Sequence, residues 1–127
     1  MNTWTNDELT KMNAIDELHL ATMKQDGTLR NPVTIWFVCV NNEFYIRAVK
    51  GPTGLWYRHA IERHEGHIDA GGVTKNITFT EVRDENIMKE IDESYQSKYS
   101  NYGAKIVTST VTPQARAATF KLIPREQ

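Results

Sequence analysis

Two kinds of hydrophobic spacing divide the chain into segments of different type. Short runs that alternate apolar with polar residues, or that are rich in Val, Ile and aromatic residues, predict β-strands. Apolar residues three or four positions apart predict amphipathic helices. Six strands are expected, at about 18–23, 29–40, 44–48, 67–70, 76–82 and 117–123. Three short helices are expected, one starting near Asn6 and two covering about 55–65 and 85–99.

The strand expected at 29–40 differs from the others because both of its faces are apolar. One face carries Val33, Ile35, Phe37 and Cys39, and the other carries Thr34, Trp36, Val38 and Val40. Such a pattern predicts a central strand that is buried on two sides or lies at a subunit contact. Pro32 cannot donate to a strand ladder, so a bend is expected near the start of this strand. Asn41 and Asn42 then predict the turn into the next strand.

Turn-forming residues punctuate the remaining segments. Asp26 and Gly27 form a dipeptide that favours a tight hairpin turn. Thr5 and Glu8 form a capping-box pair that predicts the start of the first helix. Gly66 is expected to close the helix at 55–65. With no linker, repeat or low-complexity segment, residues 1–127 predict one domain, mainly β with peripheral α-helices.

Composition and charge exclude several classes of partner. A formal charge of −1 gives no global attraction to nucleic acid or to an anionic membrane, so any basic site is local. No apolar run approaches the ~20 residues that cross a bilayer. The N-terminus lacks the pattern of a secretory signal. A single cysteine, Cys39, cannot form an internal disulfide, which favours a cytoplasmic location.

A basic, glycine-containing turn is the strongest candidate for a binding site. Arg47, Lys50 and Arg58 flank this turn, which leads into a helix whose first N–H groups lack partners. Thr53 lies within the turn, and Arg30 comes close if the preceding hairpin pairs in register. These groups are suited to a phosphate. The equally weighted alternative is that the charges are solvated and that Thr53 is an ordinary N-cap.

Other candidate groups give weaker signals. His59, His64 and His67 straddle a helix end, so solvated surface histidines are favoured over a metal site. Cys39 lies in an apolar strand and is expected to be a small buried hydrophobe rather than a nucleophile. Among the aromatic residues that could stack on a planar ring, Trp36 is expected in the core, and the role of Trp56 is left open.

These motifs together resemble a known group of proteins. The resemblance rests on the strand around Val33–Trp36, the turn from Arg47 to Arg58, and the segments 66–72, 95–99 and 122–125. The chain resembles a small family of uncharacterised bacterial proteins grouped with the FMN-binding split-barrel superfamily. That superfamily includes pyridoxamine phosphate oxidase and deazaflavin-dependent reductases.

The resemblance implies a six-stranded split β-barrel that forms a homodimer and holds flavin in two clefts between the subunits. The expected function is FMN binding. An FMN-dependent oxidoreductase that acts on a small molecule is one expected form of this function. The residues expected to contact the cofactor are Arg30, Trp36, Arg47, Lys50, Thr53, Trp56 and Arg58. No catalytic acid or base stands out, and deazaflavin or heme remain open as ligands.

The turn departs from the pattern of that superfamily at Pro52 and Trp56. Pro52 removes one N–H from the turn, and the bulk of Trp56 could fill a phosphate pocket. The alternative function is therefore a non-enzymatic small-ligand-binding protein that kept the barrel and lost the flavin site.

Overall fold

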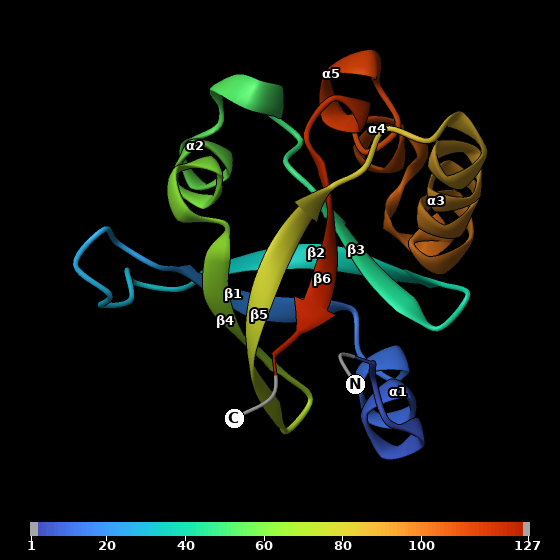
Figure 1. The fold of residues 1–127 in the computed structure, drawn as a ribbon. Helices are drawn as coiled ribbons and strands as arrows, with labels where there is room; N and C mark the ends of the chain where they lie inside the picture. Colours follow the sequence, from blue (N-terminus) through green and yellow to red (C-terminus); the bar gives the residue numbers. More distant parts are fainter. Residues whose placement is uncertain (1–2, 126–127) are drawn as a thin grey trace.

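The strands close into an antiparallel barrel (Figure 1) in the computed structural model, which describes residues 3–125. Around the barrel the order is β1-β2-β3-β6-β5-β4, and β4 pairs with β1 to complete the circle. The strands are β1 (Glu17–Thr22), β2 (Val33–Val40), β3 (Glu43–Arg47), β4 (Glu65–Ala70), β5 (Val73–Glu81) and β6 (Thr119–Pro124). All six predicted strands are present, and the predicted fold class is confirmed.

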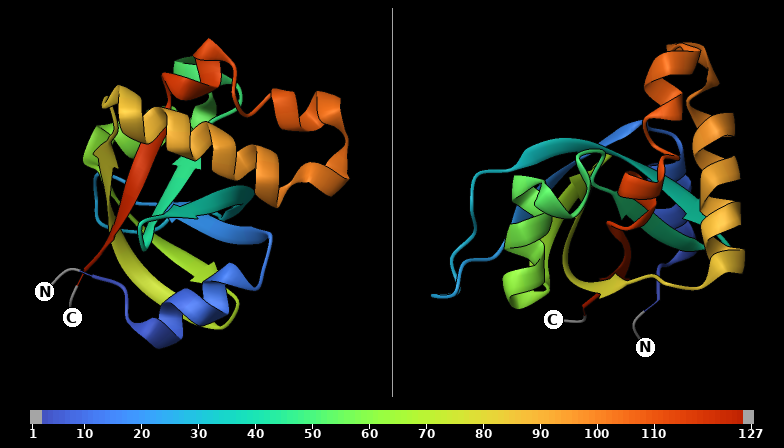
Figure 2. Two further views of the ribbon diagram at one scale, coloured as in Figure 1. Left: turned by 90° about the vertical axis from the view of Figure 1, so that its right-hand side faces the viewer. Right: turned by 90° about the horizontal axis from the view of Figure 1, so that it is seen from above.

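Helices cover the barrel on several sides (Figures 1 and 2). The longest, α3, lies along the outer face of β2, and α2 lies on another side of the barrel. The helices of the described residues are α1 (Asn6–Asn13), α2 (Leu55–Arg63), α3 (Glu85–Lys98), α4 (Ala104–Thr108) and α5 (Pro113–Arg116). The prediction of three helices was too low, because α4 and α5 are short and have no amphipathic repeat.

The doubly apolar pattern of β2 is explained by packing within the chain. Its inward residues, such as Phe37, join a fully buried barrel core that also contains Phe44, Phe79 and Phe120. The outward residue Val38 joins a second buried cluster beneath α3, together with Val40, Tyr45, Ile91, Tyr95, Tyr99 and Val107. The strand is therefore buried on two sides, which was one of the two arrangements that its sequence predicted.

The connection between β1 and β2 is longer than the sequence predicted. The turn at Asp26 and Gly27 forms, with the Asp26 carboxylate accepting from the Thr28 N–H at 3.0 Å. It lies at the tip of a loop that projects from the barrel (Figure 1), and β2 begins only at Val33 rather than at residue 29. Pro32, directly before that strand, has no N–H for the ladder, which accounts for the later start.

The end of α2 also differs from the prediction. The helix ends at Arg63, and His64 adopts the left-handed conformation with φ of 59°. Gly66 is instead the second residue of β4, where a side chain has no room. A Cβ placed there would lie 2.6 Å from the Ala21 carbonyl oxygen and 3.0 Å from the Phe79 ring. The glycine therefore permits close approach of strands rather than closing a helix.

Candidate functional site

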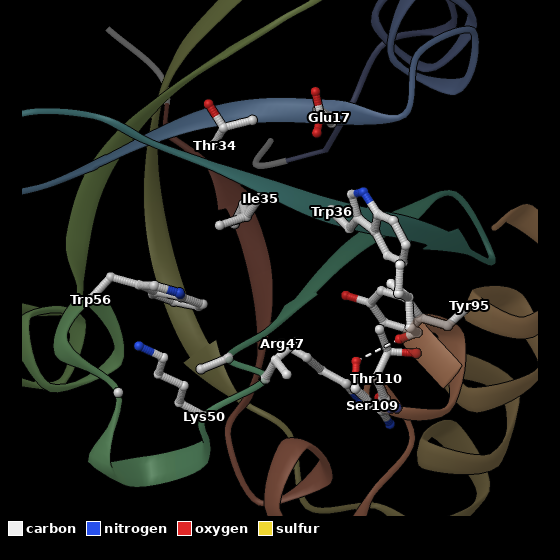
Figure 3. A pocket seen from close by; sticks show the side chains of 14 residues that line it. Glu17, Thr34, Ile35, Trp36, Arg47, Lys50, Trp56, Tyr95, Ser109 and Thr110 are labelled. Atoms are coloured by element: carbon white, nitrogen blue, oxygen red, sulfur yellow. Dashed lines mark hydrogen bonds between the residues drawn. The ribbon is translucent and has the colours of Figure 1, made fainter. Parts of the chain in front are cut away.

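A cavity of about 390 Å³ opens between the barrel, the start of α2 and the segment that follows α3 (Figure 3). Residues from β2 and β3 form its floor, and distant parts of the chain form its walls. Its lining consists of Glu17, Thr34, Ile35, Trp36, Arg47, Ala48, Val49, Lys50, Gly54, Trp56, Tyr95, Ile106, Ser109 and Thr110. Four of the seven residues predicted to contact a cofactor, namely Trp36, Arg47, Lys50 and Trp56, therefore line one cavity.

Two tryptophans stand on opposite sides of this cavity (Figure 3). Trp36 stacks on Tyr99 with ring centroids 3.9 Å apart and an angle of 5° between the rings. Trp56, from the first turn of α2, lies 6.3 Å from the Phe120 ring and also lines a smaller cavity of about 220 Å³. Both indoles are half-buried, so each is packed in the protein and also exposes surface to the cavity.

Arg47 is held by the protein itself. Its guanidinium is fully buried and forms an ion pair with Asp92, with Nη1 2.6 Å from Oδ1. Nη1 also donates to the Thr110 carbonyl at 2.9 Å, and Nε donates to Thr119 Oγ1 at 3.0 Å. Nη2 points at the carbonyl and the sulfur of Met88, both 3.4 Å away. Protein acceptors thus account for all five N–H groups of the guanidinium.

Tyr95 brings a buried hydroxyl group to the cavity. The residue belongs to α3 and is 1% exposed, and Figure 3 shows its hydroxyl directed toward the cavity. No described residue accepts a hydrogen bond from this hydroxyl, and the Arg47 backbone N–H points toward its oxygen without reaching full hydrogen-bond geometry. Burial raises the pKa of Tyr95, and the Arg47 charge and backbone N–H lower it by less. The phenol therefore remains protonated at neutral pH.

The charges at the mouth of the cavity lie on different sides. Lys50 is exposed and forms no ion pair with a described carboxylate, whereas the exposed Glu17 lies beyond Thr34 (Figure 3). Near Lys50, the N-cap of α2 is Gly54, which offers no side chain to cap the helix. The N–H groups of its first turn therefore lack intrahelical partners. An anionic group is favoured at the Lys50 end of the cavity and disfavoured at the Glu17 end.

The other three predicted contact residues lie outside this lining. Arg30 lines the smaller cavity, with its guanidinium 3.3 Å from Glu62 and 3.1 Å from the Met23 carbonyl. Thr53 is exposed and donates to the Lys50 carbonyl at 3.2 Å. Arg58 is exposed on α2. Contacts from these three residues to a cofactor stay predictions.

Several lining residues were missed at the level of sequence. Tyr95 falls in the helix expected at 85–99, and no place in the cavity was predicted for it, although it lines the cavity. Ser109 and Thr110 lie between α4 and α5, in a segment for which no structure was predicted. One usable signal was present there. Thr112 before Pro113 is a helix-start pattern, and the Thr112 hydroxyl accepts from the Ala115 N–H at 3.1 Å.

The remaining candidate groups have partners elsewhere. His64 Nε2 lies 3.2 Å from Glu81, and His67 Nδ1 lies 3.0 Å from Asn76. Over residues 3–125 no three His, Cys, Asp or Glu side chains are grouped as metal ligands would be. Cys39 is half-buried and packs against the barrel core. In the same span, no helix has the length and apolarity needed to cross a membrane.

The closed six-stranded barrel with flanking helices places the protein in the split-barrel class. The chain belongs to the DUF2255 family, described as an uncharacterized protein conserved in bacteria, whose profile matches residues 8–122. The resemblance noted in the sequence is therefore confirmed. No protein of curated function matches the chain in sequence.

Three solved structures share the fold at low sequence identity. HutZ, the heme storage protein of Vibrio cholerae, matches with a TM-score of 0.68 and 14% identity, over 96% of this chain and 91% of HutZ. A Listeria innocua protein, provisionally assigned as a pyridoxamine 5'-phosphate oxidase, matches with a TM-score of 0.66 and 11% identity, over 95% and 93%. An F420-H2 dependent reductase matches with a TM-score of 0.62 and 19% identity, over 84% and 93%.

Proposed function

We propose that the cavity binds a planar, phosphate-bearing cofactor and that FMN is this cofactor. The observation that carries the proposal is the pair of tryptophans that flank one cavity whose mouth holds Lys50 and the start of α2. A flat ring system would lie between Trp36 and Trp56. Its phosphate would lie at Lys50 and the free N–H groups of α2. Neighbours of this fold include a reductase that uses F420-H2 and a heme storage protein, so other planar cofactors are further candidates.

The residues present fit such a group in size and in chemistry. A cavity of about 390 Å³ falls in the range that holds small-molecule ligands, and its lining combines aromatic surface with few polar groups. A bound flavin would supply the redox chemistry, in which case the protein would act as an oxidoreductase on a small molecule. The chain would contribute binding, orientation of the ring and exclusion of water.

We further propose that a second copy of the chain covers the mouth of the cavity. Three apolar side chains at the start of α2 and around the cavity are exposed: Leu55 by 66%, Ile106 by 54% and Val49 by 46%. Exposed apolar side chains gathered at one site are typical of a protein interface. Light scattering at micromolar concentration is expected to give the mass of a homodimer, and the mass of a monomer would contradict this part of the proposal.

A fluorescence titration tests the cofactor. Adding the protein to FMN is expected to quench the flavin emission, since an indole lies against the ring. A colourless preparation that leaves FMN emission unchanged at tens of micromolar protein would contradict FMN binding. A titration with heme, followed by absorption, tests the second cofactor class, because the absorption band of heme shifts when heme binds.

The second candidate function is small-ligand binding without catalysis, and the position of Trp56 favours it. This indole lies between the two cavities and lines both of them. It therefore occupies space that a larger ligand would need. Replacing Trp56 with Ser separates the candidates. A plugged site gains FMN affinity when the indole is removed, whereas a site in which Trp56 packs on the flavin loses affinity.

A further inference from the structure

The neighbours of the Tyr95 hydroxyl do not give it a structural role in the folded chain. It is buried within the cavity wall, and no described residue accepts its proton, while the backbone N–H of Arg47 points toward its oxygen. Leaving a buried hydroxyl without an acceptor is unfavourable. Native proteins therefore satisfy nearly all such groups. An unsatisfied one that points into an open cavity indicates a partner that enters from outside.

The neighbours of the hydroxyl define what that partner must offer. The guanidinium carbon of Arg47 lies 5.5 Å from the centroid of the Tyr95 ring, and its charge is already balanced by Asp92. The carbonyl of Thr110, another lining residue, already accepts a bond from Arg47. Arg47 offers only donors. Because the Arg47 backbone N–H already faces the phenol oxygen, what the hydroxyl lacks is an acceptor for its proton.

We infer that Tyr95 is a specificity-determining residue that donates a hydrogen bond to an acceptor atom on the edge of a planar ring held between Trp36 and Trp56. The inference rests on the proposed function, and it adds the chemical class of the ring. Carbonyl oxygens or unprotonated ring nitrogens must lie on the edge that faces α3. Lys50, where the proposed phosphate would lie, is on the other side of the cavity (Figure 3).

Tyr99, the residue that directly follows α3, supplies a matched control. It lies four residues after Tyr95 and is also fully buried, but its hydroxyl is occupied. It accepts from the Phe37 N–H at 3.0 Å and lies 2.6 Å from the Asp16 carbonyl. Removing either hydroxyl is the same chemical change, Tyr to Phe. Only the Tyr99 change breaks bonds within the protein.

The test compares Tyr95→Phe and Tyr99→Phe by thermal melting without ligand and by titration with riboflavin and FMN. Tyr95→Phe is expected to melt within ~2 °C of the wild type or above it, because no internal bond is lost. It is expected to bind both flavins about tenfold more weakly. Tyr99→Phe is expected to melt roughly 4–12 °C lower. Below that temperature it should retain flavin affinity within about twofold, since the ring that stacks on Trp36 remains.

Three other outcomes are possible, and each would overturn the role of Tyr95. Equal flavin binding by wild type and Tyr95→Phe would overturn the role of Tyr95 and leave the proposed function standing. A melting temperature of Tyr95→Phe as low as that of Tyr99→Phe would show that the hydroxyl has an internal partner, which also overturns the inference. A wild type that binds neither flavin would overturn the proposed flavin function and the role of Tyr95 with it.

Discussion

Separating Arg47 from Asp92 is expected to destabilise the fold more than any exposed substitution. The Arg47 side chain is 0% exposed, and Asp92 is 23% exposed and lies also 3.3 Å from Arg116. Removing one partner of a buried ion pair typically costs ~3–5 kcal/mol, because the other charge remains buried without compensation. Asp92→Asn leaves the fully buried guanidinium unbalanced, so its cost should lie near ~5 kcal/mol. Arg47→Met leaves Asp92 with Arg116 and water, so its cost should lie near ~3 kcal/mol.

Urea unfolding of the two single variants and of the double variant measures these costs. For a chain of this length, ~1 kcal/mol corresponds to roughly 4 °C in melting temperature, so the single variants should melt about 12–20 °C below the wild type. The double variant should be more stable than the sum of the two losses predicts, by at least ~1.5 kcal/mol. Losses below ~1 kcal/mol in both single variants, or strictly additive losses, would refute the structural role assigned to this pair.

The same Arg47 variant separates this structural role from the role that its sequence predicted. If the guanidinium only supports the fold, Arg47→Met should weaken the binding of FMN and of riboflavin to the same extent, measured at a temperature where the variant is folded. A contact to the phosphate would instead weaken FMN by about ten- to a hundredfold and riboflavin much less. Because the N–H groups of the Arg47 side chain already bond to protein acceptors, we expect equal losses of FMN and riboflavin affinity.

Two further predictions concern groups outside the cavity. Burial lowers the pKa of Lys98 to about 8, so the folded state binds fewer protons than the unfolded state between about pH 8 and 10. The contribution of Lys98 to the free energy of unfolding should therefore rise with pH across that window, against the opposite contribution near pH 10 of tyrosines whose pKa is raised by burial, such as Tyr95 and Tyr99. Lys98→Met, which keeps most of the aliphatic stem and removes the ammonium group that lies over the Phe37 ring, should remove the Lys98 contribution, and a slope equal to that of the wild type would contradict the assignment. Gly66→Ala should destabilise the barrel by roughly 1–3 kcal/mol, because the new Cβ meets the Ala21 carbonyl at 2.6 Å. Urea unfolding measures this loss. A free energy of unfolding within ~0.5 kcal/mol of the wild type would show that the strands can separate there.

The barrel was predictable because local patterns and global packing agree. The alternation in β2, the turn at Asn41 and Asn42 and the capping box at Thr5 each depend on neighbouring residues only. Asn41 and Asn42 do take positive φ angles of 52° and 65°, as a tight hairpin requires. The strand boundaries were less predictable, because Pro32 and the close approach at Gly66 act through partners from other strands.

The site was only partly predictable, for the same physical reason. The basic turn pointed to the end of β3 and the start of α2, where Lys50 and Trp56 line the cavity, and their contact with a cofactor stays a prediction. The sequence could not reveal that Asp92 balances Arg47 from a helix 45 residues away. It could not reveal that Tyr95 points toward the cavity, since a buried tyrosine on an apolar stripe has the same pattern whether or not its hydroxyl has a partner.

The measurement that tests the central claim most directly is the ratio of FMN to riboflavin affinity, for the wild type and for Lys50→Met, by fluorescence titration at low salt. We expect the wild type to prefer FMN by about tenfold, since one charge-assisted hydrogen bond to the phosphate contributes roughly 1.5 kcal/mol. In Lys50→Met the ratio should fall toward one, with riboflavin affinity unchanged. An unchanged ratio in the variant, equal affinities in the wild type, or no binding of either flavin would contradict a phosphate-bearing flavin in this cavity.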